Sequence, residues 1–377
     1  MAPSWPGQVL QKEIPTRLSS MIPLKITVKD YNNMLHRRDF IRQLSAAGII
    51  SSMPGILLPQ RATATPVKDT TKIWACLLHL SFNMWEEYIS PRFPDRGYRP
   101  DFRVNEPLWR DALEKMAAAG LNMVVIDLGD AVKYESHPEI AVHGAWSVKR
   151  LREELQYIRR LGLEPIPKLN FSTGHDTWMG EYARMVSTEK YYSVCKDLIR
   201  EVISIFDKPR FFHLGMDEET AKHQSTYNYI VVRQNDLWWH DFFFLAEQVE
   251  KGGVRPWIWS DYVWQHPEEF FNRMPKSVLQ SNWYYKSAFD ETQTYVKAYI
   301  DLEAHGYDQV PCASNFNDDQ SMQGTVQFCS KRIANQRLYG FLQTVWKSTT
   351  EANREPILKG IALVGEAKKM YIQDHPL

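Results

Sequence analysis

Apolar runs and helical stretches alternate eight times along the chain after residue 66. Continuous apolar runs are typical of strands buried on both faces, and we expect strands at residues 75–80, 123–128, 164–170, 211–216, 256–259, 278–283, 309–313 and 338–345. Stretches with helical periodicity follow them, and predict helices at residues 106–119, 148–161, 190–206, 237–251, 267–274, 291–305, 321–336 and 355–371.

The size of this repeat favours a closed barrel. Glycines close three of the expected helices at the C′ position, at residues 120, 162 and 306. About 310 residues follow residue 66, or about 39 for each unit, which is the size of a strand-loop-helix-loop repeat. We therefore expect residues 67–377 to form a (β/α)8 TIM barrel whose active site lies where the strands end.

We expect residues 1–66 to be an N-terminal extension that contains an export signal. Arg37 and Arg38 precede a mildly apolar run over residues 44–58, and the small-residue triplet at 62–64 suits a signal peptidase. Met34 is a candidate initiator. We expect a twin-arginine signal and a periplasmic or extracellular protein; the alternative is an amphipathic helix with a chance arginine pair. The run is too short for a stable membrane span.

Charge and composition limit the classes of partner that we expect. The chain has 45 basic and 45 acidic side chains in 377 residues, so a nucleic-acid partner is not expected. Aromatic residues make up 13% of the chain and include 13 tryptophans, which suits stacking on sugar rings, although a tryptophan-rich core is the alternative. Four cysteines lack metal-type spacing, and buried free thiols are favoured over a disulfide. No cofactor or metal is expected, and the oligomeric state is not predicted.

Carboxylates, a histidine and tryptophans follow the expected strands. Because the strand ends of a barrel meet at one mouth, we expect these side chains to converge there on a carbohydrate. The candidate site residues are Asn170, His175, Asp176, Asp217, Glu218, Trp259, Asp261, Trp283, Tyr285, Asp318 and Trp346. The outer tryptophans Trp85, Trp178 and Trp264 are expected at the rim, whereas Trp109, Trp238 and Trp239 are expected to pack in the helical shell.

The segment HLGMDEE, residues 213–219, contains the candidate acid. On an alternating strand, His213, Gly215 and Asp217 share one face while Glu218 turns away. Two adjacent carboxylates in a dry pocket repel, which raises the pKa of one of them and lets it act as a general acid. The alternative is a solvated loop.

This segment resembles a known family. Residues 135–175 together with HLGMDEE are similar to the catalytic barrel of glycoside hydrolase family 20, the β-N-acetylhexosaminidases, and Trp259, Trp283 and Trp346 follow the strands at which that family places its pocket tryptophans. The resemblance implies retaining, substrate-assisted hydrolysis of terminal amino sugars. Glu218 is then the acid and base, Asp217 orients the 2-acetamido group, and His175, with Asp176 as a further member, tunes Glu218.

The chain also departs from the family pattern. The family's Pro-Glu-x-Asp element is Pro167-Lys168-Leu169-Asn170 here, its strand-one arginine has no counterpart in residues 77–83, its Tyr-x-Asp is Phe316-Asn317-Asp318, and its Trp-x-Glu is Trp346-Lys347-Ser348. These changes imply a different non-reducing sugar. Lys168 and Lys347 either bind an anionic group or pair with neighbouring acids, and pairing is the favoured interpretation.

Two other classes of protein share such a barrel. A metal-dependent sugar isomerase or epimerase would use His175, Asp217, Glu218 and Asp261 as ligands, although the chain lacks the usual paired-histidine spacing. A glycan-binding barrel without catalysis is the other alternative, and the altered recognition residues favour it.

Overall fold

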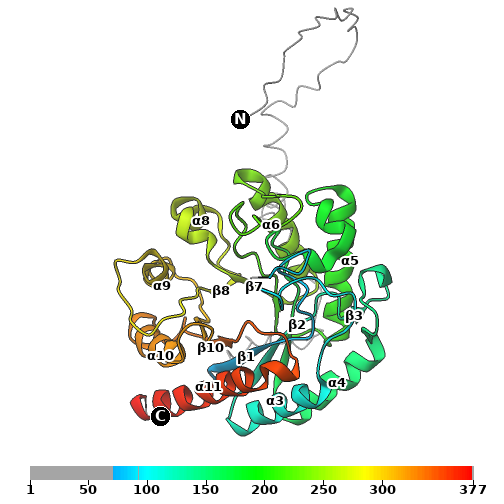
Figure 1. Cartoon of the computed structure of the whole chain (residues 1–377). Coiled ribbons are helices and arrows are strands. Elements are labelled where there is room, and N and C mark those ends of the chain that lie inside the picture. Colours follow the sequence, from blue (N-terminus) through cyan, green and yellow to red (C-terminus); the bar gives the residue numbers. More distant parts are fainter. Residues whose placement is uncertain (1–70, 92, 376–377) are drawn as a thin grey trace, which may run out of the picture. The chain divides into compact units, whose positions relative to one another are not determined.

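The described residues form a (β/α)8 barrel. The computed structural model describes residues 71–91 and 93–375, so the predicted export signal lies outside the described part. The strands are β1 (Ile73–His79), β2 (Met123–Asp127), β3 (Val132–Lys133), β4 (Trp146–Ser147), β5 (Glu164–Lys168), β6 (Phe211–His213), β7 (Arg255–Trp259), β8 (Leu279–Ser281), β9 (Cys312–Ser314) and β10 (Gly340–Thr344) (Figure 1). No helix in the described part is long and apolar enough to cross a membrane.

Eight parallel strands close into a ring. Their order is β8-β7-β6-β5-β2-β1-β10-β9, with parallel pairing throughout. Bridges between Gln280 and Gln309 and between Trp283 and Cys312 join β8 to β9 and complete the ring. All eight expected strands are confirmed. The small sheet of β3 and β4, between β2 and the next helix, was not predicted because each strand has only two residues.

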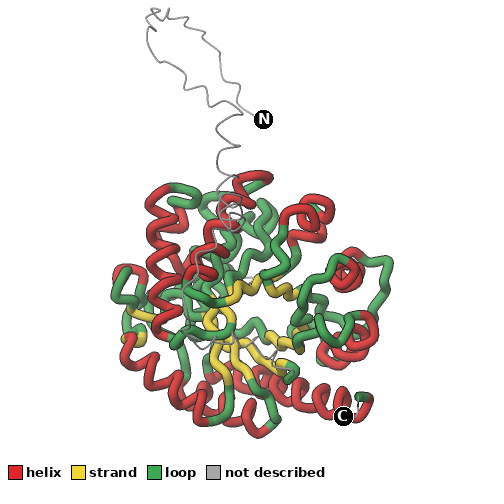
Figure 2. Tube along the Cα trace, turned by 180° about the vertical axis from the view of Figure 1, so that it is seen from behind, coloured by secondary structure: helices red, strands yellow, loops and turns green. Residues whose placement is uncertain are grey.

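Helices surround the strands, as Figure 2 shows. The α-helices are α3 (Glu106–Ala118), α4 (Val148–Arg160), α5 (Glu189–Ile205), α6 (Asn235–Lys251), α7 (Tyr262–Gln265), α8 (Pro267–Arg273), α9 (Thr294–Ala304), α10 (Ser321–Arg332) and α11 (Arg354–Asp374). The 3-10 helices are η1 (Pro138–Ile140), η2 (Thr177–Arg184) and η3 (Glu351–Asn353). Every expected helix is present, and only the short α7 and the 3-10 helices were not expected.

The helix ends follow local chemistry. The side chains of Asn105, Ser147 and Thr188 accept hydrogen bonds from the first-turn amides of α3, α4 and α5. Gly120, Gly162 and Gly306 have φ between 77° and 80° just after α3, α4 and α9, as the C′ prediction requires.

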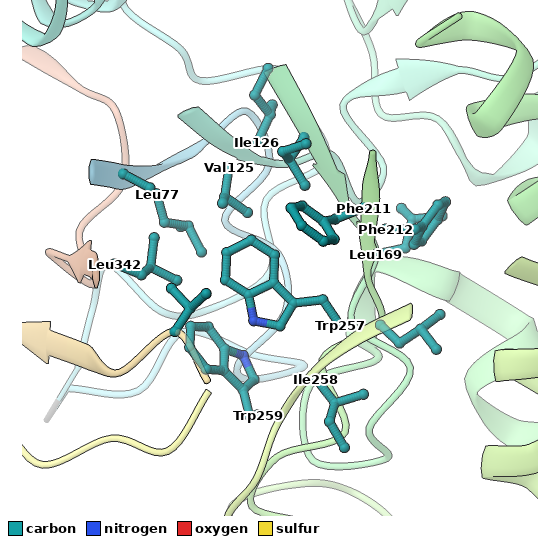
Figure 3. Close-up of a cluster of buried hydrophobic side chains, with 14 of the residues drawn as sticks. Leu77, Val125, Ile126, Leu169, Phe211, Phe212, Trp257, Ile258, Trp259 and Leu342 are labelled. Carbon is teal, nitrogen blue, oxygen red and sulfur yellow. The ribbon is translucent and has the colours of Figure 1, made fainter. Parts of the chain in front are cut away.

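The barrel interior is packed with large side chains. Strand residues alternate between the interior and the helical layer, so Phe211, Trp257 and Trp259 point inward while Phe212 and Ile258 point outward (Figure 3). Trp109, Trp238 and Trp239 are each at most 1% exposed on their helices, which confirms the shell prediction. All four cysteines are buried free thiols, as favoured above.

Candidate active site

The chain after β6 forms a strained turn that presents two carboxylates. Regular strand geometry ends at His213, and φ is 74° at Gly215, 74° at Met216 and 54° at Glu218. The expectation that His213, Gly215 and Asp217 share one face of an alternating strand is therefore wrong, because left-handed residues break the alternation. Non-glycine residues in this region cost about 1–3 kcal/mol and are concentrated at functional sites.

Asp217 lies in a buried polar pocket beneath this turn. Its Oδ2 is 3.4 Å from His175 Nε2, and its Oδ1 accepts a 2.8 Å hydrogen bond from the Asn170 amide. Burial by itself raises the pKa of Asp217, but the His175 charge, the nearby Lys168 ammonium and the Asn170 amide outweigh it and hold the pKa below its ordinary value. Asp217 is therefore a buried, fully charged carboxylate.

Glu218 faces the opening of the barrel between two histidines. Its Oε2 is 3.4 Å from His175 Nε2, and its Oε1 is 3.4 Å from His223 Nε2. Burial opposes charge on His175, but the Asp217 and Glu218 carboxylates raise the pKa of His175 to about 10. His175 is thus an imidazolium shared by both acids at neutral pH.

A third carboxyl group completes the cluster. Asp261, just after β7, accepts a 2.8 Å hydrogen bond from the backbone N–H of Glu218. Burial, with the Asp217 charge added, raises the pKa of Asp261 well above its ordinary value. The sequence predicted a split in pKa within the adjacent Asp-Glu pair. In the structure the pKa values that move in opposite directions are those of Asp217 and Asp261, so Asp261 is the neutral acid beside the charged one.

Lys168 belongs to the layer below the acids and does not reach solvent. It is fully buried, and its Nζ donates to Asp127 Oδ2 at 2.5 Å, on the neighbouring strand β2. His79 lies 3.5 Å from the same carboxylate oxygen. The suggestion that Lys168 binds an anionic substrate group is wrong, and the favoured alternative of pairing with a neighbouring acid is confirmed.

Arg233 anchors the loop between β6 and α6 through ion pairs. Arg233 donates from Nε and one terminal nitrogen to the two oxygens of Glu219, at 2.7 Å each, and its other terminal nitrogen lies 3.2 Å from Asp241 on α6. Asp176 is buried nearby, and burial raises its pKa well above the ordinary value. The charge of Glu219 is therefore balanced by Arg233 within the scaffold, whereas the Glu218 carboxylate lies between two histidines.

A cavity of about 890 Å³ opens beside Glu218. It lies within the usual size range of small-molecule sites, roughly 300–1,000 Å³. The loops after β6, β7 and β8 form most of its wall, with Glu218, Asp261 and His223 joined by seven aromatic residues: Trp238, Tyr262, Trp264, Trp283, Tyr284, Tyr285 and Tyr295.

The predicted tryptophans divide between the wall and the layer beneath it. Trp283 lines the cavity and stacks on Tyr285 at 5.1 Å between ring centroids. Trp259 is 1% exposed and packs on His213 and Trp346, while Trp346 is 8% exposed and donates its indole N–H to the Tyr285 hydroxyl. Trp259 and Trp346 thus support the site from below.

The outer tryptophans also differ from one another. Trp264 lines the cavity, and Trp85 is half-buried against His175 with ring centroids 4.9 Å apart. Trp178 is 2% exposed and donates to the Asn170 carbonyl, so its expected rim position is wrong. Asp318, in the loop after β9, accepts hydrogen bonds from the backbone amides of Ser287 and Gln320, which links two loops.

Two residues of this site were missed from the sequence. His223 follows the acid pair by five residues but reaches back to Glu218 through the curved loop. Arg96 follows β1 by 17 positions; burial lowers its pKa, and the Glu218 charge is the largest effect that opposes this shift. Neither position follows a strand directly, so strand-end reasoning did not find them.

The described residues contain no group of three or more histidine, cysteine, aspartate or glutamate side chains arranged to hold a metal ion. His175, Asp217, Glu218 and Asp261 instead contact one another as hydrogen-bonded or ion-paired groups.

Similar solved structures share the barrel. The chain is 12% identical to a glycoside hydrolase family 20 exo-β-N-acetylglucosaminidase from Vibrio harveyi in complex with N-acetylglucosamine, over 80% of this chain and 57% of that one, with a TM-score of 0.55. It is 13% identical to the family 20 β-N-acetylhexosaminidase from Streptomyces coelicolor, over 78% and 64%, and to the β-N-acetylhexosaminidase from Bacteroides fragilis, over 78% and 65%, each with a TM-score of 0.54.

The chain thus spans less than two thirds of the length of these three proteins. At this identity the likeness establishes the (β/α)8 fold. No protein-family model and no curated protein matches the chain.

Proposed function

We propose that this protein is a glycoside hydrolase that removes terminal sugars from glycans with retention, in a substrate-assisted reaction. One observation carries the proposal: the strained turn after β6 turns Asp217 into a buried, ion-paired pocket and Glu218 toward an aromatic-lined cavity. A charged carboxylate and a solvent-facing carboxylate side by side suit two different roles in one reaction. The family 20 fold of the similar structures supports the same class of chemistry.

The proposed steps follow from these positions. Glu218 donates a proton to the glycosidic oxygen, while the carbonyl oxygen of the sugar's 2-acetamido group attacks the anomeric carbon and forms an oxazolinium ion. Asp217, held anionic by His175 and Asn170, orients the acetamido N–H and stabilises the positive charge that develops there. Glu218 then takes a proton from water, which attacks the same carbon and releases the sugar.

Glu218→Gln tests the proposal directly. We expect turnover of an aryl 2-acetamido glycoside to fall by roughly 10³-fold, because the amide cannot donate or accept the required proton. Asp217→Asn should lower turnover by about 10²-fold through the lost charge. Glu153→Gln, on the outer face of α4, is the matched control and should keep full activity. Near-wild-type turnover of Glu218→Gln on a confirmed substrate would show that another group is the acid.

Hydrolysis, binding and inhibition measurements distinguish this proposal from the two alternative functions, a glycan-binding barrel and a metal-dependent isomerase. A glycan-binding barrel predicts that wild-type protein hydrolyses no aryl glycoside while Glu218→Gln still binds sugar. A metal-dependent isomerase predicts activity that a chelator removes. A thiazoline analogue of N-acetylglucosamine should inhibit the wild type, and indifference to it would mean a substrate without a 2-acetamido group.

We also propose that residues 1–66 direct export and that the barrel works outside the cytoplasm. The observation is the order of Arg37, Arg38, the apolar run and the small-residue triplet. Replacing both arginines with lysine should leave the protein in the cytoplasmic fraction of the host, whereas the unaltered chain should reach the periplasm or medium. Unchanged export of the double variant would argue against this signal.

A further inference from the structure

Two cations lie near one aromatic ring in the loops after β1, β9 and β10. The Arg96 guanidinium carbon lies 5.8 Å from the centre of the Phe316 ring, and Lys347 Nζ lies 5.7 Å from the same ring. The three residues come from the loops after β1, β9 and β10, which are neighbouring strands. Phe316 is 39% exposed, so part of this aromatic residue is accessible to a ligand.

Arg96 is held in place without using its hydrogen-bond donors. Its guanidinium also lies 4.6 Å from the centre of the Trp85 ring, and Trp85 contacts both His175 and Trp346. Among the residues described, no carboxylate forms an ion pair with Arg96 or Lys347, and no acceptor takes a hydrogen bond from either side chain. A guanidinium fixed by aromatic rings with a free planar fork of N–H groups is well suited to bind an oxyanion.

The surrounding acids leave room for an anion. The carboxylates whose charges act on the pKa of Arg96 are Glu218 and Glu86, and in the described part of the chain neither forms an ion pair with its guanidinium. Burial raises the pKa of Glu86, and the Arg96 charge opposes this shift. Asn317, next to Phe316 in the chain, lines the cavity beside Glu218, and the Glu218 charge acts on Arg96, so the cations lie near this cavity. A ligand group on Arg96 and Lys347 would therefore belong to the molecule whose glycosidic oxygen Glu218 protonates.

We propose that Arg96, Lys347 and the Phe316 ring form a subsite for an anionic group, a sulfate ester or a carboxylate, on the sugar substrate. This deepens the proposed function and rests on it. The cations bind the oxyanion, the ring packs against the sugar's apolar face, and the cavity walled by Trp264 and Trp283 is left for the rest of the glycan. The substrate class is then an acidic glycan of the sulfated or uronic type.

Calorimetry on the full chain tests this subsite without requiring turnover. The probes are N-acetylglucosamine, N-acetylglucosamine 6-sulfate and glucuronic acid. We expect wild-type protein to bind one of the acidic sugars about tenfold more tightly than the neutral sugar, and the preferred one identifies sulfate or carboxylate. The preference should shrink at high salt, because added ions screen partly exposed charges.

Charge-removing variants assign the effect to these residues. Arg96→Gln and Lys347→Gln should each reduce the acidic preference about threefold or more, the double variant should remove it, and Arg96→Lys should retain part of it. Lys149→Gln, 88% exposed on α4, is the matched control and should leave it unchanged. Equal binding of all three sugars by the wild type, or a preference that survives in a folded double variant, overturns the proposal.

Hydrolysis assays keep the two proposals apart. If the wild type hydrolyses neutral aryl glycosides but shows no preference for acidic sugars, the hydrolase assignment stands and the anionic subsite is wrong. If no glycoside is hydrolysed but an acidic sugar binds in an Arg96-dependent way, the subsite stands and the hydrolase assignment is wrong.

Discussion

Lys168 is a charged residue that is buried in the barrel and paired with an acid there. Lys168 would be expected in solvent on the basis of its side chain alone, but it is fully buried on β5 with its ammonium on Asp127. A buried ion pair contributes little compared with apolar packing, but removal of one partner leaves an uncompensated charge. Lys168 therefore serves the site through its charge, which helps to keep Asp217 ionised.

Lys168→Met should destabilise the protein by about 3–5 kcal/mol, because Asp127 would stay buried without its cation. Guanidinium unfolding monitored by tryptophan fluorescence measures this change in free energy. Lys149→Met removes an exposed lysine whose partner is Glu153, and should cost within about 0.5 kcal/mol. The double change of Lys168→Met with Asp127→Leu should recover most of the loss. A cost for Lys168→Met no larger than the control would mean that Asp127 finds another partner.

At the scale of elements, one glycine determines whether the turn after β6 can approach β5. Gly215 has φ of 74°, and a Cβ atom there would lie 1.9 Å from Asn170 Oδ1 and 2.9 Å from Asn170 Cα. Asn170 in turn donates to Asp217. The close approach of the two segments therefore positions the amide that holds the buried carboxylate.

Gly215→Ala should lower turnover and stability together. The added methyl group displaces Asn170 from Asp217, so we expect a loss of at least tenfold in kcat and about 3 kcal/mol in the free energy of unfolding. Gly162→Ala is the matched control, since its φ is 80° but nothing lies within 4 Å of its added Cβ, and it should cost only about 1 kcal/mol. Equal costs at the two positions would contradict the close-approach argument.

At the scale of the whole molecule, the charges at the mouth define a pH window of stability. The pKa of His175 is about 10 in the fold, against an ordinary value of 6.5, so its stabilising contribution is full below pH 6.5 and is lost as the pH rises toward 10. The pKa of Asp217 lies below its ordinary 3.8, so its contribution is present above pH 3.8 and is lost as the pH falls further.

His175→Gln should therefore flatten the alkaline side of the stability curve. Between pH 6.5 and 9.5 the free energy of unfolding should fall by roughly a few kcal/mol more in the wild type than in the variant. His143→Gln alters a histidine whose side chain is 87% exposed, and should keep the wild-type slope. Guanidinium unfolding at a series of pH values gives both curves, and parallel slopes for wild type and His175→Gln would disprove the coupling.

The pattern of residues along the chain predicts the barrel architecture and the strand ends at which the candidate site residues meet. Apolar runs long enough to be buried on both faces, with glycines where helices end, identify eight strand-helix units because the periodicity of burial is local. The strand ends of a barrel converge, and Asp217, Glu218, His175, Asn170 and Asp261 meet there, although the left-handed turn after β6 sets where the first two point.

Only the tertiary structure decided which charges pair and which stay free. Lys168 and Lys347 look alike in the sequence, but one is neutralised by an acid on the adjacent strand and the other lies against an open aromatic ring. His223 reaches the site through a loop that begins with left-handed residues, and Arg96 is positioned by its contact with the Trp85 ring. Pairing depends on distances between segments far apart in the chain, and no local pattern of residues encodes those distances.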